Sequence, residues 1–299
     1  WLTLGYLEPD QYLGGRKRLD LERAREALQE RIAGPLGLDP IHAALKAKEA
    51  IETTLARHIG ERVPMPSGVS LDGATLYAFG GGAGMLAHGL AKRLNLGEVY
   101  VPAVAAVFSA FGASTLDVAH RYEEIRPLTD VPVTPEALGQ ITQELRTRAL
   151  RDMRGEGFTA EDMSCALEIL CLSGTEEVGS ARGALINGRL PGELNRFLSD
   201  LPPGGRYLIV RLTATCPVPH PDLKAAGDRA ADAAEAQLGK RRIRLAAGEA
   251  DAAVYRLNRL PLGSEVRGPA IIEGAFTSVL APDQTTFRID SAGNGVMEV

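Results

Sequence analysis

The feature that most constrains the fold is a run of three glycines in the stretch YAFGGGAGMLAHGLAKRLNLGEVYVP, residues 77–102. A short apolar segment precedes the glycines, a helical pattern follows at about 84–95, and a second apolar segment lies at 99–101. This order predicts a strand, a glycine turn, a helix and a second strand. Such a unit is typical of an α/β fold.

Glycines at this turn have two interpretations. A turn without side chains lets backbone N–H groups approach an anionic or planar ligand, and the helix that follows adds a partial positive charge. The same glycines also let a strand and a helix pack closely together. The spacing matches the dinucleotide pattern GxGxxG only loosely, and the Walker pattern GxxxxGK[ST] is absent from the sequence. The residues alone therefore leave both interpretations open.

Apolar residues at helical spacing recur in several other stretches. The predicted helices cover residues 20–33, 40–59, 106–124 and 135–154. From residue 165 onward, short apolar segments alternate with polar residues, as half-buried strands do. The Ala-rich stretch 222–240 is expected to be a solvated helix or a mobile connection.

A change of pattern after residue 121 predicts two domains. Prolines at 127, 132 and 135 indicate a linker at this point. We therefore expect an α/β domain at 1–121 and a β-rich α+β domain at 122–299.

The composition argues against some classes of binding partner. The formal net charge is −5 and no long basic block occurs, which argues against nucleic acid and anionic membranes. No apolar stretch reaches the roughly 20 residues that a membrane span needs. The three cysteines, Cys165, Cys171 and Cys216, lack CxxC spacing, so a reducing cytoplasm is expected. Cys165 and Cys171 flank a strand-like stretch and are expected in the core. We predict no metal site within this chain.

Four segments together resemble the hydantoinase A/oxoprolinase family. The glycine stretch is similar to the family's adenosine-side motif. The segment AVFSAFGASTLDVAHRY (106–122) is similar to the family segment that follows it. The family's N-terminal entry to this region is similar to residues 4–28, LGYLEPDQYLGGRKRLDLERAREAL. Its terminal β segment is similar to residues 263–299, GSEVRGPAIIEGAFTSVLAPDQTTFRIDSAGNGVMEV. The loop departs from the family pattern, because a third glycine is present and Met85 stands where proline is usual.

The resemblance implies half of an actin, sugar-kinase and Hsp70-like nucleotide module at 1–121, followed by a β-rich C-terminal domain of hydantoinase A type. By the same resemblance, five consecutive residues hold the adenosine of ATP: Gly80, Gly81, Gly82, Ala83 and Gly84. Mg and the phosphates are expected to be held by residues outside this chain. The other half of the module is expected to precede Trp1.

The implied activity is ATP-dependent activation of a carbonyl or bicarbonate oxygen as a phosphorylated intermediate. The activated compound is then hydrolysed, as for hydantoins, oxoproline or lactams, or carboxylated, as for acetone or acetophenone. The expected partners are the other half of the module, a hydantoinase B-like subunit and a small-molecule substrate, and the chain is not expected to be active alone. The alternative is a non-catalytic structural or regulatory subunit of such a complex. The sequence identifies no catalytic residue.

Overall fold

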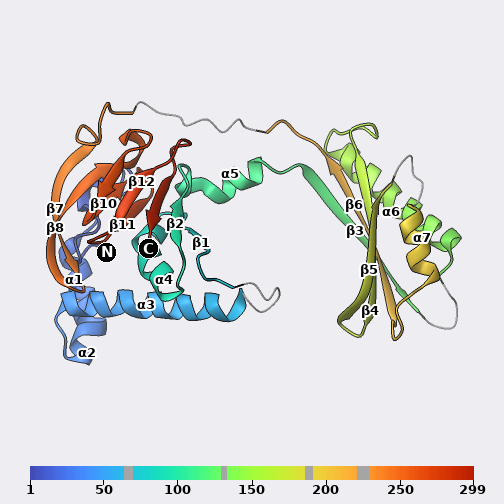
Figure 1. The fold of residues 1–299 in the computed structure, drawn as a ribbon, viewed down its shortest axis with the longest axis horizontal. Coiled ribbons are helices and arrows are strands. Elements are labelled where there is room, and N and C mark those ends of the chain that lie inside the picture. The colour runs from blue at the N-terminus through green and yellow to red at the C-terminus, as the bar shows by residue number, and fades with distance from the viewer. Residues whose placement is uncertain (64–69, 129–132, 186–190, 221–228) are drawn as a thin grey trace. The chain divides into compact units, whose positions relative to one another are not determined.

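The protein forms two compact units, described here from a computed structural model. The structure describes residues 1–63, 70–128, 133–185, 191–220 and 229–299. One unit combines Trp1–Ala113 with Asp222–Val299, and we call it the discontinuous unit. The other, Ser114–Pro221, is called the central unit (Figure 1). The expected mixed α/β class is confirmed, with three separate sheets among the described residues.

The first sheet of the discontinuous unit has five strands in the order β1-β2-β13-β12-β9. Strands β1 and β2 are parallel, as expected for a strand-helix-strand unit, and the other neighbours are antiparallel. The strand bounds are Thr75–Tyr77 (β1), Glu98–Val101 (β2), Glu265–Arg267 (β9), Thr286–Ile289 (β12) and Gly295–Glu298 (β13).

A second sheet in this unit has four strands in the order β11-β10-β8-β7. Strands β8 and β10 are parallel, and the other pairs are antiparallel. The bounds are Gln237–Leu245 (β7), Gly248–Arg256 (β8), Ala270–Glu273 (β10) and Ser278–Ala281 (β11). Residues 237–240 of the Ala-rich stretch therefore belong to a strand, and 222–228 lie outside the described residues.

The helices of the discontinuous unit agree well with the periodicity. The side chain of Asp20 accepts a hydrogen bond from the backbone N–H of Arg23 and caps the first helix. Asp39 caps the long helix in the same way, with Pro40 at its first position. The bounds are Leu21–Leu28 (α1), Gly34–Leu36 (α2), Pro40–Arg62 (α3), Ala87–Arg93 (α4) and Phe108–Ser114 (α5). Short helical turns occupy Pro9–Gln11 (η1), Gln29–Ala33 (η2), Ala83–Met85 (η3), Ala105–Val107 (η4) and Leu257–Arg259 (η5).

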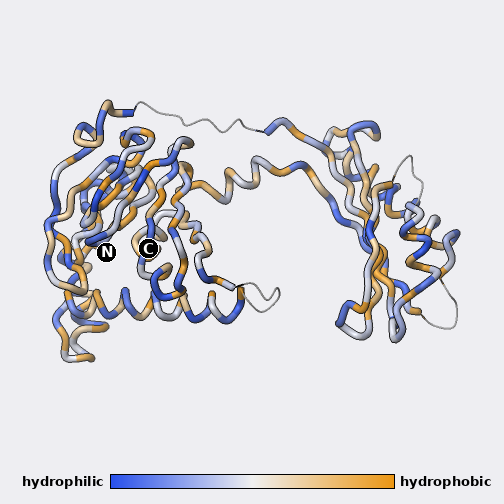
Figure 2. Tube along the Cα trace, viewed as in Figure 1, coloured by the Kyte–Doolittle hydropathy of each residue, from blue (hydrophilic) through white to orange (hydrophobic). Residues whose placement is uncertain are grey.

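The central unit is an antiparallel sheet covered by two helices. Its strand order is β3-β6-β4-β5, and buried residues alternate along β6, so one face is apolar. Apolar residues recur along these strands (Figure 2). Five apolar side chains of α6 join the same core, with all three cysteines, of which Cys165 and Cys171 are buried as predicted. The bounds are Val118–Pro127 (β3), Pro135–Gly155 (α6), Ser164–Ser173 (β4), Glu176–Ala184 (β5), Gly192–Ser199 (α7) and Tyr207–Cys216 (β6).

The predicted helix at 106–124 is wrong in its second half. Helix α5 ends at Ser114, and β3 begins at Val118. Ten consecutive residues of β3 pair with β6, and Tyr122 is buried among apolar residues of that sheet. These residues form a strand because they pair with another strand some ninety positions later in the chain. Local periodicity does not indicate such long-range pairing.

The compact units also divide the chain differently from the expected boundary between residues 121 and 122. That boundary falls inside β3, and the C-terminal stretch returns to the discontinuous unit. The physical reason is strand pairing, because Val99 and Val101 of β2 lie opposite Met297 and Gly295 of β13. The central unit is therefore inserted between two parts of one fold.

Candidate functional site

The glycine loop connects β1 to the helical turn η3 and is held at both ends by hydrogen bonds. The Gly80 N–H donates to the Ala105 carbonyl at 2.7 Å. On the other side, the Thr277 hydroxyl donates to the Gly80 carbonyl at 2.9 Å, and the Ser278 N–H donates to the Gly81 carbonyl at 3.3 Å. The loop is therefore fixed against the turn between β10 and β11.

The structure requires glycine at individual positions of this loop for different reasons. Gly80 has φ of 93°, a conformation that favours glycine. A Cβ on Gly84 would lie 2.6 Å from the Ser278 carbonyl oxygen and 2.8 Å from Val279 Cγ2, so close packing requires glycine there. A Cβ on Gly81 would lie 3.3 Å from the Phe276 carbonyl oxygen, which is tight but not a collision.

Gly82 differs from these three. Its backbone has φ of −120°, and the nearest atom to an added Cβ would be Trp1 Nε1 at 3.8 Å. The protein itself therefore leaves space for a side chain at this position. Packing explains Gly84 and backbone conformation explains Gly80, but neither explains Gly82.

A cavity of about 290 Å³ opens beside the loop, in the discontinuous unit. Gly81 and Gly82 line it, whereas Gly80, Ala83 and Gly84 do not. Ala83 instead packs against the apolar core, and Gly84 is buried. The structure thus places two of the five predicted residues at a cavity and uses the other three to shape the loop. The remaining lining residues are Trp1, Leu7, Glu8, Gln11, Tyr12, Leu13, Gly14, Met85, Arg256, Glu273, Gly274, Ala275, Phe276, Thr277 and Ser278.

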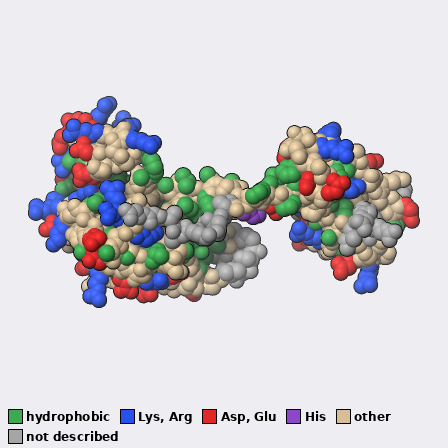
Figure 3. Space-filling view, turned by 90° about the horizontal axis from the view of Figure 1, so that it is seen from above, with side chains coloured by type: hydrophobic (Ala, Val, Ile, Leu, Met, Phe, Trp, Pro, Cys, Tyr) green, Lys and Arg blue, Asp and Glu red, His purple; other side chains and the backbone are tan. Residues whose placement is uncertain are grey.

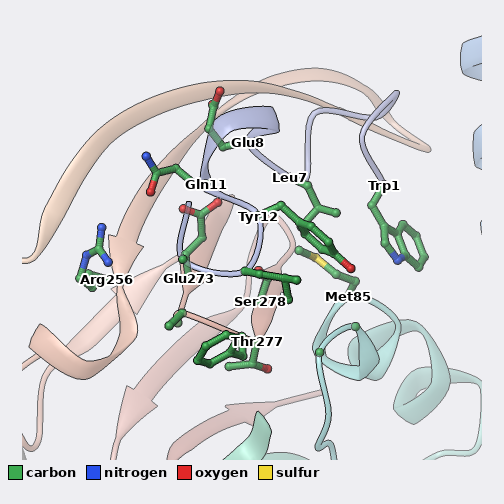
Figure 4. A pocket seen from close by; sticks show the side chains of 17 residues that line it. Trp1, Leu7, Glu8, Gln11, Tyr12, Met85, Arg256, Glu273, Thr277 and Ser278 are labelled. Carbon is green, nitrogen blue, oxygen red and sulfur yellow. The ribbon is translucent and has the colours of Figure 1, made fainter. Parts of the chain in front are cut away.

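The cavity has an apolar side and a polar side. Trp1, Tyr12 and Met85 lie together on one side, and Gln11 and Arg256 lie on the other (Figure 4). Aromatic rings and a thioether are favourable surfaces for a flat ring system.

The polar side is anchored by a buried charge network. Glu273, whose side chain is 13% exposed, forms an ion pair with Arg241 at 2.8 Å. Arg241 also lies 3.4 Å from the carboxylate of Glu8. The arginine pairs with both carboxylates, whose oxygens can also accept hydrogen bonds from a ligand in the cavity.

Sequence reasoning missed the residues that come from the two ends of the chain. Trp1 and Tyr12 belong to the N-terminal segment, and Phe276 belongs to the turn between β10 and β11. Tyr12 and Phe276 lie in two of the four segments that resemble the family, which is the signal that could have directed attention to them, whereas Trp1 precedes the first of these segments. Nothing in their spacing predicts that they meet at the glycine loop.

Other kinds of site receive little support in the part of the chain that the structure describes. No group of three or more His, Cys, Asp or Glu side chains there could hold a metal ion. Burial raises the pKa of each cysteine thiol, which disfavours the reactive thiolate. Acidic and basic side chains are interspersed on the surface seen in Figure 3. Among the described helices, none combines the length and apolar character that crossing a bilayer requires.

Comparison with known families gives two matches. Residues 1–122 match the hydantoinase/oxoprolinase family, and residues 206–293 match the hydantoinase/oxoprolinase C-terminal domain. The chain belongs to the hydantoinase/oxoprolinase family. The glycine loop lies in the first match, and the turn that holds it lies in the second. Two matched regions of the family thus build one cavity.

Curated relatives of this family member are subunits of larger enzymes. The chain is 30% identical to the acetophenone carboxylase gamma subunit of Aromatoleum aromaticum, over 99% of this chain and 44% of the relative. It is 27% identical to the acetone carboxylase beta subunit of Xanthobacter autotrophicus, over 94% and 43%. It is 26% identical to caprolactamase subunit alpha of Pseudomonas jessenii, over 97% and 44%. The chain therefore spans less than half the length of these relatives.

Two solved structures share the fold. Nucleotide-free acetone carboxylase, from a study of ATP-dependent acetone carboxylation, superposes with a TM-score of 0.78 at 24% identity. The ATP-dependent caprolactamase from Pseudomonas jessenii superposes with a TM-score of 0.71 at 25% identity. Each match covers 99% of this chain and 45% of the other.

Proposed function

We propose that this chain supplies the adenosine side of the nucleotide site in an ATP-dependent enzyme of the hydantoinase/oxoprolinase family. The adenosine would lie in the cavity beside Gly81 and Gly82. The observation that carries the proposal is the open space at Gly82, where the fold itself does not require glycine. A nucleotide that passes close to the backbone at this point would explain why this position is glycine.

The chemistry of the lining supports a purine base. An adenine ring can stack against aromatic side chains such as Trp1 and Tyr12. Its exocyclic amino group is a hydrogen-bond donor, and Glu8 and Gln11 offer acceptor oxygens on the polar side. The N–H groups of Gly81 and Gly82, which line the cavity, would then be available to the ribose or to the first phosphate.

The role of ATP in this proposal is phosphoryl activation of a carbonyl or bicarbonate oxygen. Phosphoryl transfer depends mostly on positioning and on neutralising the phosphate charge, with Mg as the usual counter-ion. The residues described here would bind and orient the adenosine, and residues outside this chain would hold Mg and the phosphates. The complete site would then need the rest of the nucleotide module. The whole enzyme would also need a hydantoinase B-like subunit.

Substitution of Gly82 by valine tests this proposal. The isopropyl group would enter the cavity, so the affinity for a fluorescent ATP analogue should fall by about tenfold or more, equivalent to about 1.4 kcal/mol. The titration uses the chain purified together with the polypeptides that associate with it. Thermal unfolding without nucleotide should change little, because the nearest atom to the new Cβ is 3.8 Å away.

Gly139→Val is the matched control. Gly139 lies in α6 of the central unit, and an added Cβ there meets no atom within 4 Å. This variant should bind the analogue as the parent does. If Gly82→Val stays folded and also binds like the parent, the adenosine role of the loop is refuted, and the alternative of a structural or regulatory subunit gains support.

A further inference from the structure

A second cavity in the discontinuous unit lies between α3, α4 and the turn joining β7 to β8. Its volume is about 600 Å³, and it shares no lining residue with the cavity beside the glycine loop. The lining comes mainly from α3 and α4 on the charged side and from the second sheet on the apolar side. The proposed nucleotide site makes no use of these residues.

Glu52 lies at the centre of the charged side. Its side chain is only 5% exposed and forms ion pairs with Lys48, which is 17% exposed, and with Arg93. Helix α4 packs directly on this carboxylate, because a Cβ on Gly89 would lie 2.2 Å from Glu52 Oε1. The carboxylate is therefore fixed, and one negative charge is shared between two cations.

The cavity as a whole carries a small excess of positive charge. Four cationic side chains line it, and three carboxylates accompany them, with the imidazoles counted as neutral. Lys92 is exposed, and no ion pair of this residue is found among the described residues. The cations are Lys46, Lys48, Lys92 and Arg93, and the carboxylates are those of Glu49, Glu52 and Asp283.

The pKa of His88 also indicates a positive electrostatic potential in this cavity. Burial lowers the pKa of this imidazole, and the positive charges of Lys92 and Lys48 lower it further, against the opposite effect of Glu52. The half-buried ring therefore lies where the cations outweigh the carboxylate. A neutral imidazole at this position can donate a hydrogen bond to an anion.

The opposite wall is apolar. Leu245 and Leu280 of the second sheet line it, together with Tyr6, and Leu45 of α3 adds an apolar side chain beside the charged residues. The Tyr6 hydroxyl donates to the Arg244 carbonyl at 2.7 Å, so it presents mainly its ring to the cavity. Cations on one side and leucines on the other match a ligand with one charged end and an apolar body.

We propose that this cavity binds a small organic monocarboxylate with an apolar body. The single excess positive charge complements one carboxylate, whereas a dianion such as a phosphate monoester would also face Glu49, Glu52 and Asp283. The carboxylate would lie near Lys92 and Arg93, and the apolar body would lie against Leu245 and Leu280. Benzoate and hexanoate carry both parts of this ligand and serve as probes.

Calorimetric titration of the full chain tests the proposal. Benzoate and hexanoate should bind at least tenfold more tightly than benzamide and hexanamide, which keep the apolar body and lose the charge. Lys92→Met should weaken binding of both acids about threefold to tenfold, and Lys92→Glu should weaken it further. Lys92 is exposed, so both variants should unfold at the same temperature as the parent.

Lys17→Met is the matched control, because Lys17 is exposed and lies outside the cavity. It should bind both acids as the parent does. The proposal is overturned if neither acid binds at millimolar concentration, if the amides bind equally well, or if inorganic phosphate binds in preference to the acids. It is also overturned if Lys92→Glu, shown to be folded, binds the acids unchanged.

Discussion

The discontinuous unit and the central unit use glycine differently. In the central unit, added Cβ atoms on Gly179, Gly183 and Gly205 would lie within 2.6 Å of side chains in the same unit. In the discontinuous unit, Gly84 serves close packing in the same way, but Gly82 faces a cavity. The comparison teaches that a glycine which packing does not require and which also lines a cavity, as Gly82 does, is the better indicator of a ligand.

The two units also differ in which parts of the chain build their cores. The core of the central unit is built from residues that lie between Val118 and Cys216, within one continuous stretch of the chain. The core of the discontinuous unit joins Val99 and Val101 to residues near the C-terminus, such as Phe287 and Met297. Both cavities described above lie in the discontinuous unit. Damage to the central core should therefore reduce stability without changing the affinity of either cavity.

Leu212→Ala should give the largest effect on stability. Leu212 is fully buried in β6, opposite Leu167 of β4 and Tyr122 of β3. Truncation of such a leucine costs about 2–5 kcal/mol, because apolar contacts are lost and a cavity remains. Denaturant unfolding followed by circular dichroism measures the loss.

The control for this prediction is Leu116→Ala, since Leu116 belongs to the same unit but is 67% exposed. Its effect should stay within about 0.5 kcal/mol. The separation of the two units would be contradicted if Leu212→Ala weakened binding of an ATP analogue at a temperature where the variant is still folded.

Gly84→Ala should give an intermediate effect, in the discontinuous unit. The new methyl group would lie against the Ser278 carbonyl and the Val279 side chain, and such overpacking costs about 1–3 kcal/mol. Gly82→Ala is the matched substitution two residues away and should change the melting temperature far less. Thermal unfolding of the two variants decides the point. Equal losses would show that the difference between packed and open glycines in this loop does not hold.

The local parts of the fold could be predicted from the sequence. The strand-glycine-helix-strand order at 75–101 and the start of α3 at Pro40 depend on neighbouring residues, and the structure confirms them. The identity of β3 and the return of β13 to β2 depend on pairing between residues far apart in the chain. No local pattern reports such pairing, because the stabilising contacts form only after the chain has folded.

The candidate site was predictable to the same limited extent. The glycines marked the loop, but their separate roles depend on what each added Cβ would meet, as at Gly82 and Gly84. Tyr12 and Phe276 enter the cavity from segments near opposite ends of the chain. The family resemblance pointed to these segments without indicating that they meet.

A pair of partly buried tyrosine hydroxyls offers the finest comparison of the two units. In the discontinuous unit, Tyr100 donates to Asp290 at 2.9 Å, and in the central unit Tyr122 donates to Asp152 at 3.0 Å. Burial, followed by the hydrogen bond to the aspartate, raises the pKa of each tyrosine to about 12. Burial alone would raise the pKa of Asp290, but its hydrogen bonds from Asn294 and Tyr100 outweigh this effect and lower it.

Tyr100→Phe and Tyr122→Phe should each destabilise the protein by about 1 kcal/mol at neutral pH, the typical net value of one hydrogen bond. A lowered carboxyl pKa gives stability that is present above the ordinary value of about 3.9 and is lost as the pH falls through the folded value. A raised tyrosine pKa gives stability that is complete below about pH 10 and is lost as the pH rises through the folded value. The difference between parent and variant should therefore be constant from about pH 5 to 9 and shrink on both sides. Urea unfolding across this range measures it, and a difference that stayed constant into acid and alkali would show that the hydroxyls act through packing and not through these hydrogen bonds.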